Sequence, residues 1–304
     1  MPGKQVTELD ALPSFTDDSL LPVHNGTGLK KGLLSQLASY LGTKFSNPNL
    51  LINPDFKINQ RGETSYTSEV AHTIKNVYSV DRWYLYGHSL TVNSDNSVTI
   101  TPTTYSDGAL IQQLETPVEG NITIQVYVVG VSGTATVSVG PYDGSSTTEI
   151  GTLKNGLNTF TFSRGIKRLV IRVNSGTLTL KYAKVEQGSI ATKFVEPNKS
   201  EELAKCKRFT QYYDSIPCIP GILFVENTTG ATSGWLPLYQ ILSPSMRVVP
   251  TISVFNVMAN NGNIISGNYS VNLDNNRLKS VVFKEASNYH TITINKVLLD
   301  AEIY

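Results

Sequence analysis

The chain has 304 residues, and 25 Lys and Arg side chains against 24 Asp and Glu side chains leave a net charge of +1. Because only 16% of the residues are charged, the sequence predicts no strong field for nucleic acid or an anionic membrane. Short runs rich in Thr, Ser, Val and Ile, with 23 Gly and 14 Pro, favour many strands joined by turns. We expect a mostly β protein with two domains.

The N-terminus predicts an arm, residues 1–47, followed by the first β domain. It has no basic stretch followed by an apolar core, so we expect no secretory signal. The longest apolar run, near 122–131, is too short to span a bilayer. Pro13 and Pro22 favour an extended arm, and Gly26 to Gly28 predict a turn. The stretch GLLSQLASYLG predicts one short helix that ends at Gly42 and must dock on a partner. Its apolar face is expected to carry Leu33, Leu34, Leu37, Ala38 and Leu41.

Residues 48–197 predict an antiparallel β-sandwich of the jelly-roll kind. Apolar and polar residues alternate in six runs, with turn residues between them at intervals of roughly 10–15 residues. The runs are 97–101, 121–128, 135–139, 159–162, 169–173 and 178–182.

The densest aromatic stretch of this domain, Val80–Gly87, predicts both core and surface rings. Alternation places Trp83 on one face of a strand and Tyr84 and Tyr86 on the other. We expect Trp83 to be buried and the Asp81-Arg82 pair to be structural. A flat ring flanked by polar groups suits sugar stacking. The candidate ligand contacts are therefore Tyr84, Tyr86, Tyr66 and Tyr105.

Residues 198–214 predict a short helical neck. Pro197 prevents a helix before it, Ser200 is a suitable N-cap, and acidic residues follow in the first turn. Steps of three and four place Leu203, Cys206, Thr210 and Tyr213 on one face. A helix this short needs packing against other residues or against another copy of the chain. Both cysteines, Cys206 and Cys218, are expected to be reduced and buried.

Residues 215–304 predict a second, C-terminal β domain. Its strand-like runs are separated by turn-prone pairs such as Asn-Gly and Thr-Gly. The runs are 219–225, 235–242, 247–257, 269–273, 278–283 and 291–304.

The sequence predicts no catalytic or metal site. His24, His72, His88 and His290 lack paired spacing, and neither a C-x-x-C nor a G-x-S-x-G motif occurs. The glycines and lysines of residues 26–31 lack phosphate-loop spacing. Adjacent carboxylates point apart, and no β-helix repeat is present. We expect no enzyme activity and no cofactor. A structural Ca²⁺ and ordinary turn chemistry explain four loop residues equally well: Asp95, Asn96, Asp107 and Asp143.

Four segments, in order, resemble bacteriophage tail fibres and related virion appendages: LPSFTDDSLLPVHNGTGLKKGLLSQLASYL, NLLINPDFKINQRG, EQGSIATKFVEPNKSEELAKCKRFTQYY and SPSMRVVPTISVF. The third departs from the usual pattern by having Phe209-Thr210 where tyrosines are common. The resemblance implies a sandwich like a carbohydrate-binding module, located on the virion. It implies anchoring to other virion proteins through Leu33, Leu34, Leu37 and Leu41. It also implies a homotrimer whose neck is formed by Leu203, Cys206 and Tyr213.

Three function hypotheses follow. The first is a virion fibre that attaches to host-surface or mucus glycans by multivalent, non-catalytic binding. The second is a purely structural head-fibre, collar or capsid-decoration subunit without receptor binding. The third, a cellular glycan-binding or glycoside-processing module, predicts a monomer and leaves the N-terminal arm unexplained.

Overall fold

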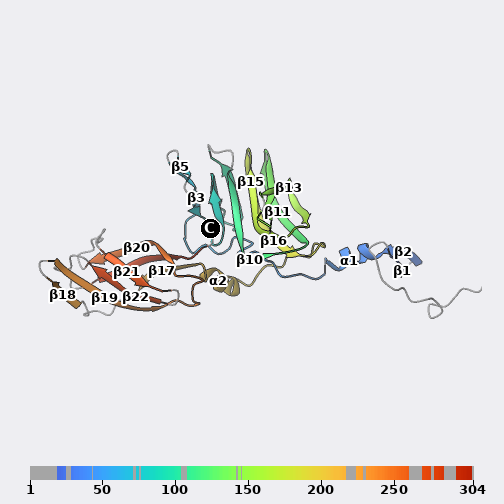
Figure 1. Ribbon diagram of the computed structural model, residues 1–304. Helices are drawn as coiled ribbons and strands as arrows, with labels where there is room; N and C mark the ends of the chain where they lie inside the picture. The colour runs from blue at the N-terminus through green and yellow to red at the C-terminus, as the bar shows by residue number, and fades with distance from the viewer. Residues whose placement is uncertain are drawn as a thin grey trace, which may run out of the picture.

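The computed structural model is mostly β, with antiparallel sheets and two short helices among the residues it describes (Figure 1). These residues are 19–24, 29–42, 44–70, 73–74, 77–103, 108–141, 143–144, 146–216, 224–228, 231–259, 269–274, 277–283 and 292–302. The fold class expected from composition and alternation is confirmed.

The arm contains a hairpin that the sequence did not predict. Strand β1 (Leu20–His24) pairs antiparallel with β2 (Leu29–Leu33), and α1 (Leu34–Gly42) follows directly. Pro22 is tolerated because β1 has a single partner strand, so one edge of it needs no hydrogen bonds. The sequence predicted an extended arm with a turn but no strand pairing within it, and Leu33 ends a strand instead of lying on the helix.

The sandwich consists of two six-stranded antiparallel sheets, ordered β13-β12-β15-β10-β7-β6 and β14-β11-β16-β9-β8-β3. Strands β10, β11 and β12 alternate between the sheets, as do β14, β15 and β16, which fits the expected jelly-roll arrangement. A small hairpin joins β4 to β5. The bounds are β3 (Ser65–Thr67), β4 (Glu69–Val70), β5 (Thr73–Ile74), β6 (Val77–Tyr78), β7 (Tyr84–Tyr86), β8 (His88–Val92), β9 (Val98–Pro102), β10 (Ala109–Val118), β11 (Ile122–Ser132), β12 (Ala135–Pro141), β13 (Thr148–Thr152), β14 (Gly156–Phe162), β15 (Ile166–Val173) and β16 (Thr177–Gln187).

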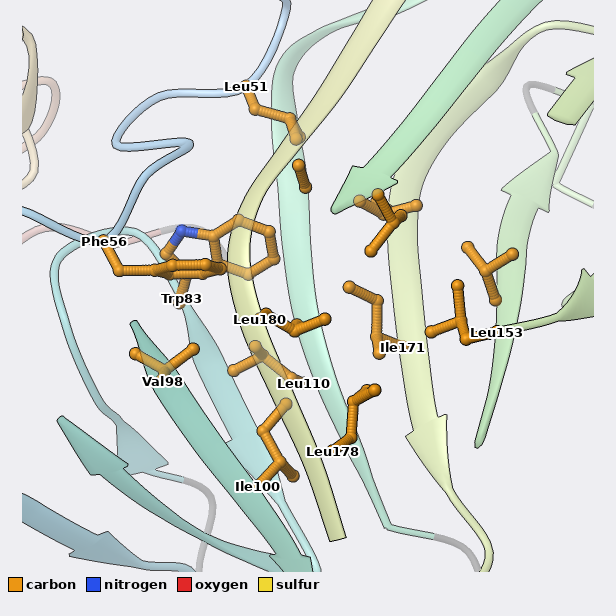
Figure 2. Close-up of a cluster of buried hydrophobic side chains, with 14 of the residues drawn as sticks. Leu51, Phe56, Trp83, Val98, Ile100, Leu110, Leu153, Ile171, Leu178 and Leu180 are labelled. Carbon is orange, nitrogen blue, oxygen red and sulfur yellow. The ribbon is translucent and has the colours of Figure 1, made fainter. Parts of the chain in front are cut away.

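Alternation along the strands fills the space between the two sheets with apolar side chains (Figure 2). In β11, Ile122, Ile124 and Val126 are fully buried, and Leu110 of β10 and Ile171 of β15, from the opposite sheet, belong to the same core. Side chains of both sheets interdigitate in this way because a strand turns every second residue to the same face.

Helix α2 (Lys199–Lys207) begins and ends earlier than predicted. The side chain of Asn198, not Ser200, caps it by accepting hydrogen bonds from Ser200 N (2.9 Å) and Glu201 N (3.3 Å). Strand β17 (Thr210–Ile216) follows and pairs with the C-terminal strand β23 (Ile292–Asp300). Thr210 and Tyr213 therefore lie on a strand, and the predicted four-residue helix face does not exist.

The C-terminal domain has a three-stranded sheet, β17-β23-β20, and a four-stranded sheet, β18-β19-β22-β21. Figure 1 shows these sheets at one end of the molecule and α1 at the opposite end, with the sandwich between them. The remaining bounds are β18 (Phe224–Thr228), β19 (Ala231–Ile241), β20 (Thr251–Ala259), β21 (Tyr269–Leu273) and β22 (Arg277–Phe283).

Candidate functional site

Strand β7 places the predicted tyrosines as its alternation requires. Leu85 is fully buried in the core, and Tyr84 and Tyr86 are half-buried on the opposite, outer face. Trp83 is also fully buried. Its ring packs against Phe56 in a tilted arrangement, with centroids 5.0 Å apart at 47°, and its indole N–H donates to Asn53 O at 2.8 Å. The prediction of a core tryptophan beside surface-facing tyrosines is confirmed.

Neighbouring strands extend this outer surface, which we call the tyrosine face. Across the sheet, Tyr84 lies opposite Tyr78 of β6 and Ile111 of β10, and the two tyrosine rings meet edge to face at 5.4 Å. Tyr86 lies opposite Ala109. Strand β15 lies two strand spacings, about 10 Å, from β7, and its outward-pointing residues belong to the same face. The tyrosine face is thus made of Tyr78, Tyr84, Tyr86, Ile111, Gln113, Thr136, Ser138, Arg168, Val170 and Arg172. Of these, Tyr78, Thr136, Ser138 and Val170 are buried.

Two polar atoms of this face are buried without a hydrogen-bond partner among the described residues: Thr136 Oγ1 and Arg168 Nε. The Arg168 side chain crosses Gly140, where a Cβ would lie 2.5 Å from its Cγ and Nε, and its Nη2 donates to Thr147 Oγ1 at 2.9 Å. Both atoms are inaccessible to solvent, and they lie on strands two and three places away from β7 in the sheet.

The other two candidate tyrosines are not part of this face. Tyr66 lies in β3 of the opposite sheet and is only 6% exposed. Its hydroxyl donates to Asn59 Oδ1 at 2.5 Å, and burial raises its pKa to about 12. Tyr66 is therefore a core residue, and its assignment as an exposed contact was wrong. Tyr105 lies outside the described residues.

A second aromatic cluster, which the sequence did not predict, lies on the outer face of the other sheet. Tyr127 of β11 and Tyr182 of β16 are cross-strand partners, with ring centroids 5.4 Å apart at 20°. Phe194 stacks on Tyr182 at 4.0 Å and 6°. Tyr182 thus has a ring against each of its faces, whereas Tyr127, which is 38% exposed, contacts a ring on one face only. Alternation placed Tyr127 and Tyr182 on strands, and the register between β11 and β16 brings them together.

Phe194 belongs to a segment, residues 188–195, that we call the strap. The strap covers a buried ion pair in which Lys184 Nζ lies 3.2 Å from Glu186 Oε2. Thr192 N donates to Glu186 Oε1 at 2.7 Å, and Lys184 Nζ donates to Thr192 Oγ1 at 2.6 Å. The Gly-Ser-x-Ala-Thr-x-Phe pattern of this segment thus fastens the strap to the outer face of the sheet.

Segments far apart in sequence meet where the sandwich joins α2 and the C-terminal sheets; we call this place the junction. It consists of residues 52–61, 80–83, 202–210 and 300–302. Asn53 N donates to Glu202 Oε1 at 2.6 Å, and the Asn53 side chain binds both Ile58 N (2.9 Å) and Asp81 O (2.9 Å). Two of the segments that resemble phage fibres therefore contact each other here.

Buried charges dominate the junction. Arg82 donates from Nη1 to Glu302 Oε2 at 2.5 Å and from its backbone N to Oε1 at 3.1 Å. Arg61 donates to Asp300 Oδ2 at 3.1 Å and lies 3.8 Å from Asp81. Three carboxylates thus share two guanidinium groups. Burial raises the pKa of Asp81 and of Glu302, against the opposing effect of the arginines.

The proposed trimer-neck residues pack within their own chain. Cys206 is fully buried in a cluster with Ile52, Ile58 and Phe209, against which Leu203 also packs. Cys206 is an unpaired, buried thiol, as predicted, and burial raises its pKa. Tyr213 lies on β17 opposite Val297. The expectation that Cys206 faces a partner copy was wrong, because its own sandwich covers it. Cys218 lies outside the described residues.

The arm leucines divide into two pairs. Leu33 and Leu34 are half-buried, whereas Leu37 and Leu41 are each 41% exposed on α1. Neither helix of the described chain combines the length and apolarity that a membrane span requires.

Loop carboxylates considered for Ca²⁺ take part in local contacts. Asp95 accepts from Ser97 and from Lys181 Nζ at 2.9 Å, and these bonds lower its pKa. Asn96 adopts φ 63°, as turn residues do, and Asp143 pairs with Arg164 at 3.6 Å. Asp107 lies outside the described residues. Within the described ranges, no three His, Cys, Asp or Glu side chains are grouped so that they could hold a metal.

Comparison with protein-family models and with curated proteins gives no match. Among solved structures, the chain is similar to a carbohydrate-binding module of family 29, at 16% identity and a TM-score of 0.29, over 43% of this chain and 93% of the module. Forms of that module complexed with cellulohexaose (17%, 0.29, 44% and 97%) and with mannohexaose (16%, 0.30, 40% and 91%) are similar to the same degree. A likeness this weak carries no argument about function.

Proposed function

We propose that this chain is a fibre or appendage protein of a bacteriophage particle and that its tyrosine face binds glycans without catalysing a reaction. The observation that carries the glycan proposal is the pair Tyr84 and Tyr86, half-buried side by side on the outer face of β7. Rings fixed in this way lose little conformational entropy when a sugar stacks on them. Gln113, on the neighbouring strand β10, supplies a side-chain amide as a hydrogen-bond donor.

The arrangement of the ends supports a fibre. The hairpin and α1, in the segment that resembles virion attachment sequences, lie opposite the C-terminal sheets (Figure 1). In the proposal the arm binds other particle proteins and the C-terminal domain points outward. A homotrimer would present several tyrosine faces, and linked weak sites raise avidity by roughly 10²–10⁴.

Binding without catalysis agrees with how the buried carboxylates are used. Asp81 and Glu302 contact arginines, Glu186 pairs with Lys184, and Glu202 accepts from Asn53 N. A general acid or base must instead reach a substrate. The proposal includes no cofactor. A structural Ca²⁺ would show as a fall in melting temperature after treatment with a chelator.

A glycan array with the full-length protein tests the proposal. We expect binding that falls at least about tenfold when Tyr84 or Tyr86 is replaced by alanine, as loss of a stacking ring predicts. Tyr127→Ala, on the opposite sheet, is the matched control and should bind normally. Binding that survives both substitutions with the fold intact would contradict the tyrosine face.

The structural alternative, a head-fibre, collar or capsid-decoration subunit, has one observation in its favour. The most extensive buried polar cluster of the described chain joins domains instead of facing solvent. Background binding on the array, with protein whose assembly state is verified by light scattering, would favour that alternative.

A further inference from the structure

A hollow of about 420 Å³ lies between the C-terminal end of α1 and the strap; we call it the arm groove. Its walls come from Ala38, Leu41 and Gly42 of α1, from Phe45, and from Ile190 of the strap. No residue lining it is charged. The groove therefore joins two segments that separately resemble phage fibres.

Backbone contacts hold the groove open without a ligand. Lys193 N donates to Gly42 O at 2.9 Å and to Phe45 O at 3.2 Å, and Asn47 N donates to Thr192 Oγ1 at 2.9 Å. A Cβ at Gly42 would lie 2.7 Å from Ala191 O, so glycine permits this close approach. A preformed groove loses little entropy when a partner binds.

Large apolar side chains around the groove are exposed to solvent. Phe45 is 65% exposed, and Leu41 and Ile190 are each 41% exposed. Leu37 and Tyr40 continue the same exposure along α1. Clustered exposure of this kind marks an interaction site, because scattered single residues are the rule on monomer surfaces.

The charges near the groove select the kind of partner. Lys44 precedes Phe45 at the C-terminal end of α1, and no acidic residue occurs from Ser19 to Pro54. The strap adds Lys193, while Glu186 beneath it is buried in its pair with Lys184. Glu119 lies at the end of the groove that Gln187 lines, where its backbone carbonyl oxygen accepts a hydrogen bond from the Gln187 side chain.

The shape and the charges of the groove distinguish between three possible occupants: a second copy of the chain, a membrane and a segment of another protein. A second copy of the same face would bring lysines against lysines, which is unfavourable. A membrane would meet a hollow instead of a protruding apolar ridge. A protein segment with both apolar side chains and carboxylates matches the hollow and its basic rim.

We propose that the arm groove binds a segment of a partner protein that inserts apolar side chains between Phe45 and Ile190 and presents carboxylates to Lys44 and Lys193. The inference deepens the proposed function by giving the chemistry of the particle component to which the arm attaches. Glycan binding by the tyrosine face is independent of it.

A fluorescently labelled peptide with the sequence QVTELDALPSFTDD serves as the probe. This sequence, residues 5–18 of the chain, has four carboxylates, five apolar side chains and no basic residue. We expect the full-length protein to bind it in fluorescence anisotropy, more weakly as salt increases. The double variant Phe45→Ser, Ile190→Ser should weaken binding at least about tenfold, and Lys44→Glu severalfold.

Leu157→Ser is the matched control, since Leu157 is 53% exposed on β14 and outside the groove. It should bind the peptide normally. The proposal is overturned if the peptide does not bind, if the serine variants bind it normally, or if replacing its carboxylates by amides changes nothing. Groove-dependent binding to phosphatidylserine vesicles without peptide binding would also overturn it. Because the glycan array is a separate measurement, failure here leaves the proposed function intact.

Discussion

The sandwich core and the junction hold the same chain together by opposite means. The core contacts are apolar, with Leu110, Ile171 and Leu178 fully buried between the sheets (Figure 2). The junction instead buries Arg82 and Glu302 at 1% and 0% side-chain exposure. Apolar packing tolerates many partners, whereas a buried charge requires one specific counter-charge. The difference suggests that the core provides stability and the junction fixes how the domains are joined.

The largest expected effect comes from removing one half of the buried ion pair. Arg82→Leu leaves Glu302 buried without its guanidinium and should lower the free energy of unfolding by about 3–5 kcal/mol. The double variant with Glu302→Leu should recover most of that loss. Urea denaturation of the single and double variants measures both effects. Arg164→Leu is the control: its side chain is 51% exposed, so its pair with Asp143 should contribute under about 1 kcal/mol.

Truncating a side chain in the apolar core should lower the free energy of unfolding slightly less. No second substitution in the core should restore that loss. Leu110→Ala leaves a cavity and should lower the free energy of unfolding by about 2–5 kcal/mol. Combining it with Ile171→Ala should deepen the loss, in contrast to the ion pair. A double core variant more stable than either single variant would remove the distinction between the two regions.

A substitution in the strap should have a smaller effect on stability, between that of a core residue and that of a surface residue. Phe194→Ala removes one ring of the Tyr127, Tyr182 and Phe194 stack and should cost about 1–2 kcal/mol. Val195→Ala, next to it and 60% exposed, should change stability by less than about 0.5 kcal/mol. Equal effects of the two substitutions in urea denaturation would show that the stacked rings do not hold the strap.

The smallest effect concerns pH. Burial raises the pKa of Glu302 above its ordinary value of 4.5, so the folded chain holds that proton more tightly than the unfolded chain. Its contribution to stability is therefore complete below pH 4.5 and is lost as pH rises through the raised value. On the surface, Lys57 lowers the pKa of Glu196, so the pH dependence is reversed. The contribution of Glu196 to folding stability is lost as pH falls.

Melting temperatures of the wild type and of Glu302→Gln, from pH 4 to 8, measure this effect. Glutamine keeps the shape of a protonated glutamate and cannot ionise. We expect the wild type to lose melting temperature relative to the variant as pH rises above 4.5. A difference that stays constant or grows with pH would contradict a raised pKa at the junction.

Much of the local structure could be predicted from the sequence. Alternation in residues 121–128 and 178–182 predicted strands and their core faces, and the same pattern put Trp83 opposite Tyr84 and Tyr86. Helix α2 was predicted with its N-cap two residues late, since Asn198 and Ser200 are both good caps and only the backbone path selects between them. Tyr66 was misplaced because short, mixed runs give weak periodicity.

What the sequence determined by itself was the alternation of apolar and polar faces along each strand and the residues at which the strands are interrupted. The tertiary structure decided which faces meet. Arg82 and Glu302 are 220 residues apart, and Tyr127 and Tyr182 depend on the register of two strands. Local patterns cannot encode such pairs, because periodicity specifies the side of an element on which a residue lies and not the distant element that covers it.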